Sequence, residues 1–443
     1  MELRDLVVTP IVLILVYGAA YSIRPYVTDA VNRRYFLPGL TVRIVGAIAL
    51  GFIYQFYYSG GDTFNYHTHG SRHIWEAIVN PPHAGFKLFF AQGEYSTDTY
   101  EYASKIYFFR DPASYMVIRI AAFFDLLTFS SYSATAVFFG LISFIGMWLF
   151  FLTFYRIDPA LHRWFAIAAF FIPSVFFWGS GILKDSVTLS ALGAATYFFH
   201  RILILKKISF LSIVLLLLSL YFIFEIRKFI LQAYFPAVIV WFFADNYNKI
   251  RSFFLRIFLV PVVGAICLYF AYVSVYQVGE GDARYALKNI SRTARVTAYD
   301  IRYWTGRDAG SGYSLGDLDD SPETFIRLAP QAINVSLFRP YLWEVSNPLM
   351  LLSALESLLL FIFTVYVLAR KRFRFFRMMT TPHAAFCFTF VFIFAFAVGV
   401  STFNFGTLVR YKIPLLPFFV TALALVAFHE NKERKVSLFE STE

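Results

Sequence analysis

Apolar runs of 16 to 23 residues recur from one end of the chain to the other, with polar connections between them. A helix of about 20 apolar residues spans the hydrocarbon core of a bilayer. The pattern does not show the short alternating strands of a membrane β-barrel. We therefore predict an all-α polytopic membrane protein. Eleven transmembrane helices are expected, at about 6–22, 38–58, 134–154, 164–179, 186–203, 208–225, 229–244, 254–276, 347–369, 384–402 and 413–429.

The composition agrees with this class of protein. Hydrophobic residues make up 58% of the chain and charged residues 15%, whereas about a quarter of a soluble domain is charged. The net charge of +11 does not indicate a nucleic-acid partner, because the basic residues occur in short clusters between apolar runs. The first run follows Glu2, Arg4 and Asp5, which is not the basic start of a signal peptide, so we expect it to be retained.

The connections richest in Lys and Arg all fall on one side of the membrane when eleven spans are counted. The positive-inside rule makes that side cytoplasmic, and we expect a multi-pass protein of the cytoplasmic (inner) membrane. The clusters are Arg24/Arg33/Arg34, Arg156/Arg163, Arg201/Lys206/Lys207, Lys249/Arg251/Arg256, Arg370/Lys371/Arg372/Arg374/Arg377 and Lys432/Arg434/Lys435.

This topology requires that the apolar segment Ser114–Ser130 does not cross the membrane. The segment carries Arg119 and Asp125, and its apolar positions recur at helical spacing, so we predict a helix that lies in the interface or re-enters the bilayer. The chain is then one membrane domain, 1–443, with two large loops on the outer face. The first loop, 59–133, contains interfacial helices, and the second covers 278–346.

The first loop opens with Gly60, Gly61 and Asp62. Glycine pairs allow a tight turn and the close approach of a ligand, and a carboxylate beyond them is well placed as a general base. Asp62 is equally suited to cap a helix that begins at Thr63. Both interpretations stay open.

Histidines follow Asp62 in the same loop. His67, His69 and His73 are close in sequence, and His73 and Glu76 share a helix face. This local spacing does not provide the three or four convergent ligands of a zinc site, and the polar faces of interfacial helices explain it as well. No metal ligand is assigned, although a divalent cation, Mg²⁺ or Mn²⁺, remains open as a cofactor. His67 is also a candidate for substrate binding.

Basic residues at the expected outer face form the remaining candidate site. Lys184 and Asp185 follow the turn that begins at Gly179, and the helix after them directs its first N–H groups outward. A capped turn with a snorkelling lysine is the alternative. The other candidates are Arg410, Tyr411 and Lys412 before the last span, and Arg227 and Lys228 between two spans. Arginine suits bidentate phosphate contacts and lysine acts as a point charge.

Two motifs stand far apart in the chain: Gly60-Gly61-Asp62 early in the first outer loop, and Arg410-Tyr411 with Pro414 and Pro417 near the last span. Their order resembles that of the C-type (GT-C fold) glycosyltransferases. The resemblance covers roughly 38–210 and 400–430. It implies a polyprenyl-phosphate-linked sugar as donor, a glycan or lipid acceptor, and an active face directed outward. The chain departs from the commoner pattern in having one acid rather than an acidic pair, an additional N-terminal span, and no large C-terminal soluble domain.

Two alternatives remain. Gly60, Asp62 and Tyr66 also resemble the Gly-x-Asp-x-x-x-Tyr motif of membrane exopolysaccharide polymerases, so the chain is alternatively a polymerase or ligase for lipid-linked oligosaccharides. A transporter, a flippase or a non-catalytic membrane subunit is the other class. Asp185, Glu225 and Glu356 are then the acids suited to ion coupling.

Overall fold

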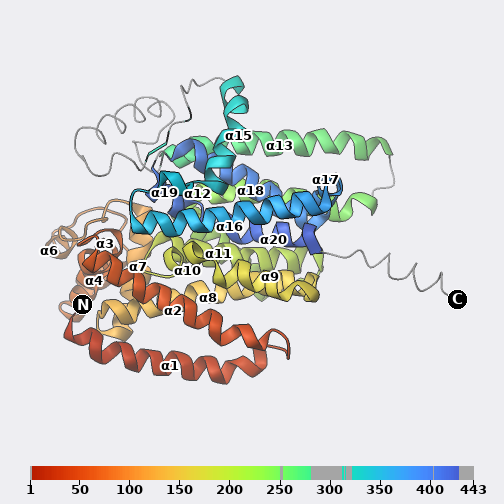
Figure 1. Ribbon diagram of the computed structural model, residues 1–443. Helices are drawn as coiled ribbons and strands as arrows, with labels where there is room; N and C mark the ends of the chain where they lie inside the picture. The colour runs from red at the N-terminus through yellow and green to blue at the C-terminus, as the bar shows by residue number, and fades with distance from the viewer. Residues whose placement is uncertain are drawn as a thin grey trace. The chain divides into compact units, whose positions relative to one another are not determined.

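The computed structural model describes residues 2–249, 253–280, 312, 313, 315, 322–402 and 404–428 (Figure 1). Within these residues the regular structure is helical, apart from one isolated β-bridge between Gly312 and Asn404. The chain divides into two compact units. Unit 1 contains Met1–Phe151, Ala169–Gln232 and Val409–Pro414, and unit 2 contains Leu152–Ala168, Ala233–Leu408 and Leu415–Glu443. The single membrane domain expected from the sequence stays a prediction.

The helices of the N-terminal part begin with two long ones and continue with short ones, among which α7, α8 and α11 are longer. They are α1 (Leu3–Val27), α2 (Arg33–Phe56), α3 (Asp62–Tyr66), η1 (His67–Ser71), α4 (Arg72–Val79), α5 (Pro82–Phe89), α6 (Tyr100–Ala103), α7 (Pro112–Thr128), α8 (Tyr132–Ile157), η2 (Pro159–Leu161), α9 (His162–Ala166), η3 (Ile167–Phe171), α10 (Pro173–Trp178), α11 (Lys184–Phe199) and η4 (His200–Ile204).

The C-terminal part is again dominated by long helices. They are α12 (Phe210–Asn246), η5 (Tyr247–Lys249), α13 (Phe253–Glu280), α15 (Pro322–Phe338), η6 (Leu342–Glu344), α16 (Pro348–Lys371), α17 (Arg374–Met379), α18 (Pro382–Ser401), α19 (Phe405–Tyr411) and α20 (Leu415–Phe428).

The chain is a multi-pass helical membrane protein. Among the described residues, seven helices are long and apolar enough to cross a bilayer: α1, α2, α8, α11 with η4, α12, α16 and α18. An eighth span results if α19 and α20, which are bent by 64° at the break between them, cross together. The all-α, multi-pass class predicted from the hydrophobic pattern is therefore confirmed, whereas the count of eleven is not.

Four of the expected spans account for the difference between eleven and eight, because two of them form a single helix and two are not candidate spans. The expected spans 208–225 and 229–244 lie in one helix, α12, which is interrupted at Arg227. The expected span 164–179 is divided into short helices, and the last of these starts at Pro173, which has no N–H to continue the helix before it. The expected span 254–276 is α13, whose apolar part among the described residues is the shorter stretch Phe258–Val273.

Some of the expected connections lie outside the described residues. They include most of the second loop, namely 281–311, 314 and 316–321, as well as Arg251 and the basic tail Lys432/Arg434/Lys435. The described end of that loop, from Pro322, contains α15 and η6. Which side of the membrane each connection occupies stays a prediction.

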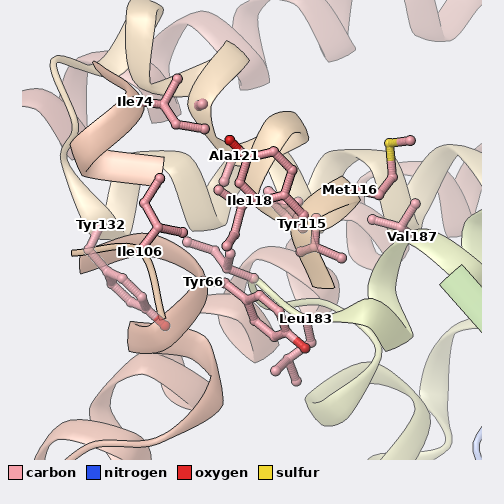
Figure 2. Close-up of a cluster of buried hydrophobic side chains, with 14 of the residues drawn as sticks. Tyr66, Ile74, Ile106, Tyr115, Met116, Ile118, Ala121, Tyr132, Leu183 and Val187 are labelled. Atoms are coloured by element: carbon pink, nitrogen blue, oxygen red, sulfur yellow. The ribbon is translucent and has the colours of Figure 1, made fainter. Parts of the chain in front are cut away.

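Within unit 1, the first predicted loop folds into the helices α3 to α7 around a buried apolar cluster. Figure 2 shows Tyr66, Ile74, Ile106, Tyr115 and Ile118 of this cluster directed toward one another. Helix α7 contributes most of its length and contacts α3, η1, α4 and α11. It has 17 residues and is not among the candidate spans, and whether this segment crosses the membrane stays a prediction. Its position in the interface stays a prediction.

An arginine in the middle of α2 links the long helices of unit 1. The Arg43 side chain is fully buried and donates hydrogen bonds to the carbonyl oxygens of Ala169 (2.8 Å), Val175 (2.8 Å) and Gly179 (3.2 Å). It also donates to the hydroxyl of Ser143 at 3.1 Å. The broken segment 167–179 exposes carbonyl groups that a continuous helix would use, so Arg43 supplies the donors that the break removes.

Unit 2 is built around α18, which contacts α13, α15 and α20. Helices α16 and α20 also lie side by side (Figure 1). Aromatic rings fill the spaces: Trp241 stacks on Phe386 with ring centroids 4.1 Å apart, and Trp164 stacks on Phe363 and Phe428. Such stacking adds about 0.5–1.5 kcal/mol per pair beyond the burial of apolar area.

Candidate functional site

The backbone at Gly60 and Gly61 directs Asp62 away from the end of α2. Their φ angles are 133° and 124°, values that favour glycine. A Cβ atom at Gly61 would lie 2.8 Å from the ring of Tyr54. Asp62 is the first residue of α3 and the N-cap position belongs to Gly61. The carboxylate of Asp62 instead accepts a hydrogen bond from Arg410, so it does not act as the helix cap that was one interpretation of the sequence.

Arg410 is the centre of the cluster, and its segment, Val409–Pro414, belongs to unit 1. Its Nη1 atom lies 2.7 Å from Oδ2 of Asp62, and its Nη2 atom lies 3.4 Å from Oδ2 of Asp185. The guanidinium also lies 5.6 Å from the centre of the Trp178 ring. Trp178 and Tyr54 face each other edge to face at 6.3 Å, so two aromatic side chains border the cation.

A second arginine holds the other oxygen of Asp185. Nη2 of Arg227 lies 2.9 Å from Oδ1 of Asp185, and both side chains are buried. Arg227 has φ −148° and ψ 78°, so it interrupts the helical conformation of α12. Its guanidinium lies 4.8 Å from the ring centre of Tyr411. We define the four charged residues Asp62, Asp185, Arg227 and Arg410 as the arginine–aspartate cluster.

Lys184, beside Asp185 in the first turn of α11, has a different partner. Its ammonium lies 3.1 Å from Oδ2 of Asp111, which is the N-cap of α7 and accepts a hydrogen bond from the backbone N–H of Ala113. Burial alone would raise the pKa of Asp111, but Lys184 and the hydroxyl of Ser114 together lower it below its ordinary value of 3.8. The pair ties the first loop to the start of α11.

We expect an Asp111→Asn variant to be less stable than the wild type at neutral pH, by less than about 1 kcal/mol, because the ion pair is partly exposed. The folded-state pKa of Asp111 is lowered. Its stabilisation is therefore complete above the unfolded-state pKa, near 4, and is lost as the pH falls through the folded value. Thermal unfolding of both proteins between pH 7 and pH 3 measures how the difference in stability changes with pH. A difference that stays constant down to pH 3 would contradict the assignment.

Three other residues predicted to bind substrate have different surroundings. His67 is fully buried, with Nε2 3.3 Å from Oδ1 of Asp125, and Ser71 and Thr135 donate hydrogen bonds to the same carboxylate. Lys412 is also fully buried. Lys228 is exposed, with its ammonium over the ring of Phe224. Of the predicted residues, Asp62, Asp185, Arg227 and Arg410 come together directly, and Tyr411 joins them through Arg227.

The histidines of the first loop do not converge. His73 contacts Glu76 at 3.0 Å, as their spacing of three residues predicts, whereas His69 is exposed. In the part of the chain that the structure describes, no group of three or more His, Cys, Asp or Glu side chains is placed to hold a metal ion.

The sequence reasoning missed Tyr54, Asp111 and Trp178, which border the cluster or pair with Lys184. Nothing in their local sequence distinguishes them from the many other aromatic and acidic residues near helix ends. Arg43 was also missed, although a single arginine inside an apolar run is a signal that the sequence does contain.

The arginine–aspartate cluster contains two carboxylates and two guanidinium groups, so its charges balance when all four are ionised. No protein-family model, curated protein or solved structure matches this chain. The chemistry of the cluster is therefore the basis for assigning a function. It combines a partly exposed carboxylate with two cations that suit an oxyanion.

Proposed function

We propose that the chain is an integral-membrane glycosyltransferase of the GT-C type, which transfers a sugar from a polyprenyl-phosphate donor to an acceptor hydroxyl. The main support is the position of Arg410, 2.7 Å from Asp62 and 3.4 Å from Asp185. A candidate general base and a candidate phosphate ligand are thereby in direct contact, although they are 348 residues apart in the sequence.

In this proposal the arginines bind the phosphate of the donor. A guanidinium group offers parallel N–H donors that match phosphate oxygens. Asp185 touches both Arg410 and Arg227, so it holds the two guanidinium groups near each other. Charge develops on the leaving phosphate in the transition state, and preorganised cations stabilise it there.

Asp62 is the proposed general base. Its side chain is 40% exposed, so an acceptor hydroxyl can reach it. Asp62 accepts the hydroxyl proton while the acceptor oxygen forms a bond to the anomeric carbon. The bond between that carbon and the phosphate oxygen breaks, and the polyprenyl phosphate leaves with the electron pair. This single displacement inverts the anomeric configuration.

The surroundings fit a sugar that is carried by a lipid. Trp178 lies beside Arg410 with its ring 5.6 Å from the guanidinium, and Tyr54 directs its hydroxyl toward the same group; aromatic side chains of this kind commonly border sugar sites. The cluster lies where α2 ends and α11 begins. A donor anchored in the membrane would present its phosphate at such helix ends. We propose that this end faces outward from the cytoplasmic membrane and that the acceptor is a glycan or lipid.

Sugar transfer by the full chain in lipid nanodiscs tests the proposal. Polyprenyl phosphates that carry labelled hexoses or pentoses serve as donors, and Mg²⁺, Mn²⁺ and EDTA are compared. The proposal predicts one transferred sugar per acceptor with inverted configuration. A ladder of products would instead favour the polymerase or ligase alternative. Uptake of labelled substrate into proteoliposomes without a glycosylated product would favour a transporter or flippase.

A further inference from the structure

We propose that Asp62 occupies, in the unloaded protein, the place on Arg410 that a substrate phosphate takes. Phosphate binding then displaces the carboxylate and frees it to act as a base. The inference rests on the proposed function for the second of these steps, while the first is a statement about anion binding alone. It goes beyond the roles of the two residues, because it makes phosphate binding and base activation one event.

The exposures of the two aspartates decide which one an arriving anion displaces. The side chain of Asp62 is 40% exposed and that of Asp185 is 1% exposed. Asp185 is also held from its other oxygen by Arg227 at 2.9 Å, whereas Arg410 is the hydrogen-bond donor to Asp62. An anion that approaches from solvent therefore meets the Asp62–Arg410 pair first, and Asp62 is the carboxylate that can withdraw into water.

The backbone before Asp62 allows this withdrawal. Gly60 and Gly61 have positive φ angles, and a Cβ atom at Gly60 would meet nothing within 4 Å. Glycine moves among backbone conformations at little steric cost. Asp185, in contrast, is in the first turn of the 16-residue helix α11. The exposed acid therefore follows a glycine pair at the start of the five-residue helix α3, whereas the buried acid lies at the start of the 16-residue helix α11.

The cluster also contains donors that Asp62 does not satisfy. Nη1 of Arg227 and Nε of Arg410 are buried and have no hydrogen-bond partner. Buried donors are nearly always paired in folded proteins, so these two are free to bond a ligand, although Oδ1 of Asp185 in the same cluster and the Nε atoms of Arg24, Arg43, Arg119 and Arg201 are also without a hydrogen-bond partner. A phosphate has more acceptor oxygens than the carboxylate that it replaces. It can therefore keep Arg410 and engage these donors as well.

The test is the affinity of the full chain in nanodiscs for farnesyl monophosphate, measured for the wild type and for Asp62→Asn. Removing the competing carboxylate is expected to tighten binding by roughly two- to five-fold, since an exposed ion pair contributes up to about 1 kcal/mol. Asp98→Asn is the matched control, because it removes one exposed acid of the same loop that pairs with Lys87. This control is expected to bind as the wild type does.

Arg410→Gln is expected to lose most of the affinity. Unchanged or weaker binding by Asp62→Asn would overturn the inference, as would wild-type affinity in Arg410→Gln. If Arg410→Gln fails to fold, the affinity of Asp62→Asn alone tests the inference. This variant is expected to fold, because the Asp62–Arg410 ion pair is partly exposed and Arg410 still pairs with Asp185.

Farnesol and inorganic phosphate identify the recognised group. The inference predicts that the Asp62→Asn effect is absent with farnesol. If inorganic phosphate also binds Asp62→Asn more tightly than the wild type, the phosphate alone is the recognised group. If only farnesyl monophosphate does so, the recognised group is a lipid headgroup. Tighter phosphate binding without any sugar transfer would keep this inference and refute the glycosyltransferase proposal. Sugar transfer that depends on Asp62, without any change in phosphate affinity in Asp62→Asn, would support the glycosyltransferase proposal and refute this inference.

Discussion

An Asp62→Asn variant is expected to transfer sugar about 10²- to 10⁴-fold more slowly than the wild type, the range that general-base assistance typically contributes. Asparagine has nearly the same shape as aspartate but cannot accept the acceptor's proton. The rate is measured with saturating donor in nanodiscs. Because the same change is expected to tighten phosphate binding, the loss should appear in kcat rather than in the KM for the donor.

The Asp98→Asn variant controls for the loss of one negative charge from the first loop. Asp98 is 53% exposed and pairs with Lys87, and it is expected to leave transfer unchanged. Undiminished transfer by a well-expressed Asp62→Asn protein would remove Asp62 from the mechanism.

An Arg43→Met variant is expected to be less stable than the wild type by about 2–4 kcal/mol. Methionine fills much of the same volume but cannot donate to the carbonyl groups of Ala169 and Val175, which Arg43 contacts at 2.8 Å. A buried acceptor left unsatisfied costs about 1–3 kcal/mol, and the bilayer core offers no water in exchange. Removing a buried charge relieves some desolvation, but four donated hydrogen bonds offset that cost in the wild type.

Thermal unfolding in the same nanodiscs measures this change, with Arg34→Met as the matched control. Arg34 is exposed near the start of the same helix and donates a hydrogen bond to the carbonyl oxygen of Val31, just before the helix. Its replacement is expected to change stability by less than about 0.5 kcal/mol. If Arg43→Met proves as stable as the wild type, Arg43 does not hold the broken segment 167–179.

The hydrophobic pattern was sufficient to predict the class of fold. Membrane helices must satisfy their backbone groups internally, and each therefore leaves a long apolar run. The same pattern could not locate breaks within a run. Arg227 interrupts α12 where the sequence indicates two spans, and Pro173 starts a short helix inside an expected span. Whether such a break ends a span or bends one depends on tertiary contacts that periodicity does not contain.

The candidate site was predictable only as a set of residues on one face. Counting spans placed Asp62, Lys184 and Arg410 on the same side of the membrane, but it could not supply their distances. The contact of Arg410 with Asp62 and Asp185 depends on how α2, α11 and the segment Val409–Pro414 approach one another. His67 shows the converse case, because a polar residue in an outer loop was expected near substrate and is instead buried against Asp125.

The most direct measurement of the central claim, that Asp62 and Arg410 act as one site for sugar transfer, is a double-mutant cycle. Transfer rates are compared for the wild type, Asp62→Asn, Arg410→Gln and the double variant. Residues that act as a unit show strongly non-additive effects, so the double variant is expected to be about as slow as the slower single variant. Losses that multiply, or a wild type that transfers no sugar from any polyprenyl-phosphate donor, would contradict the account.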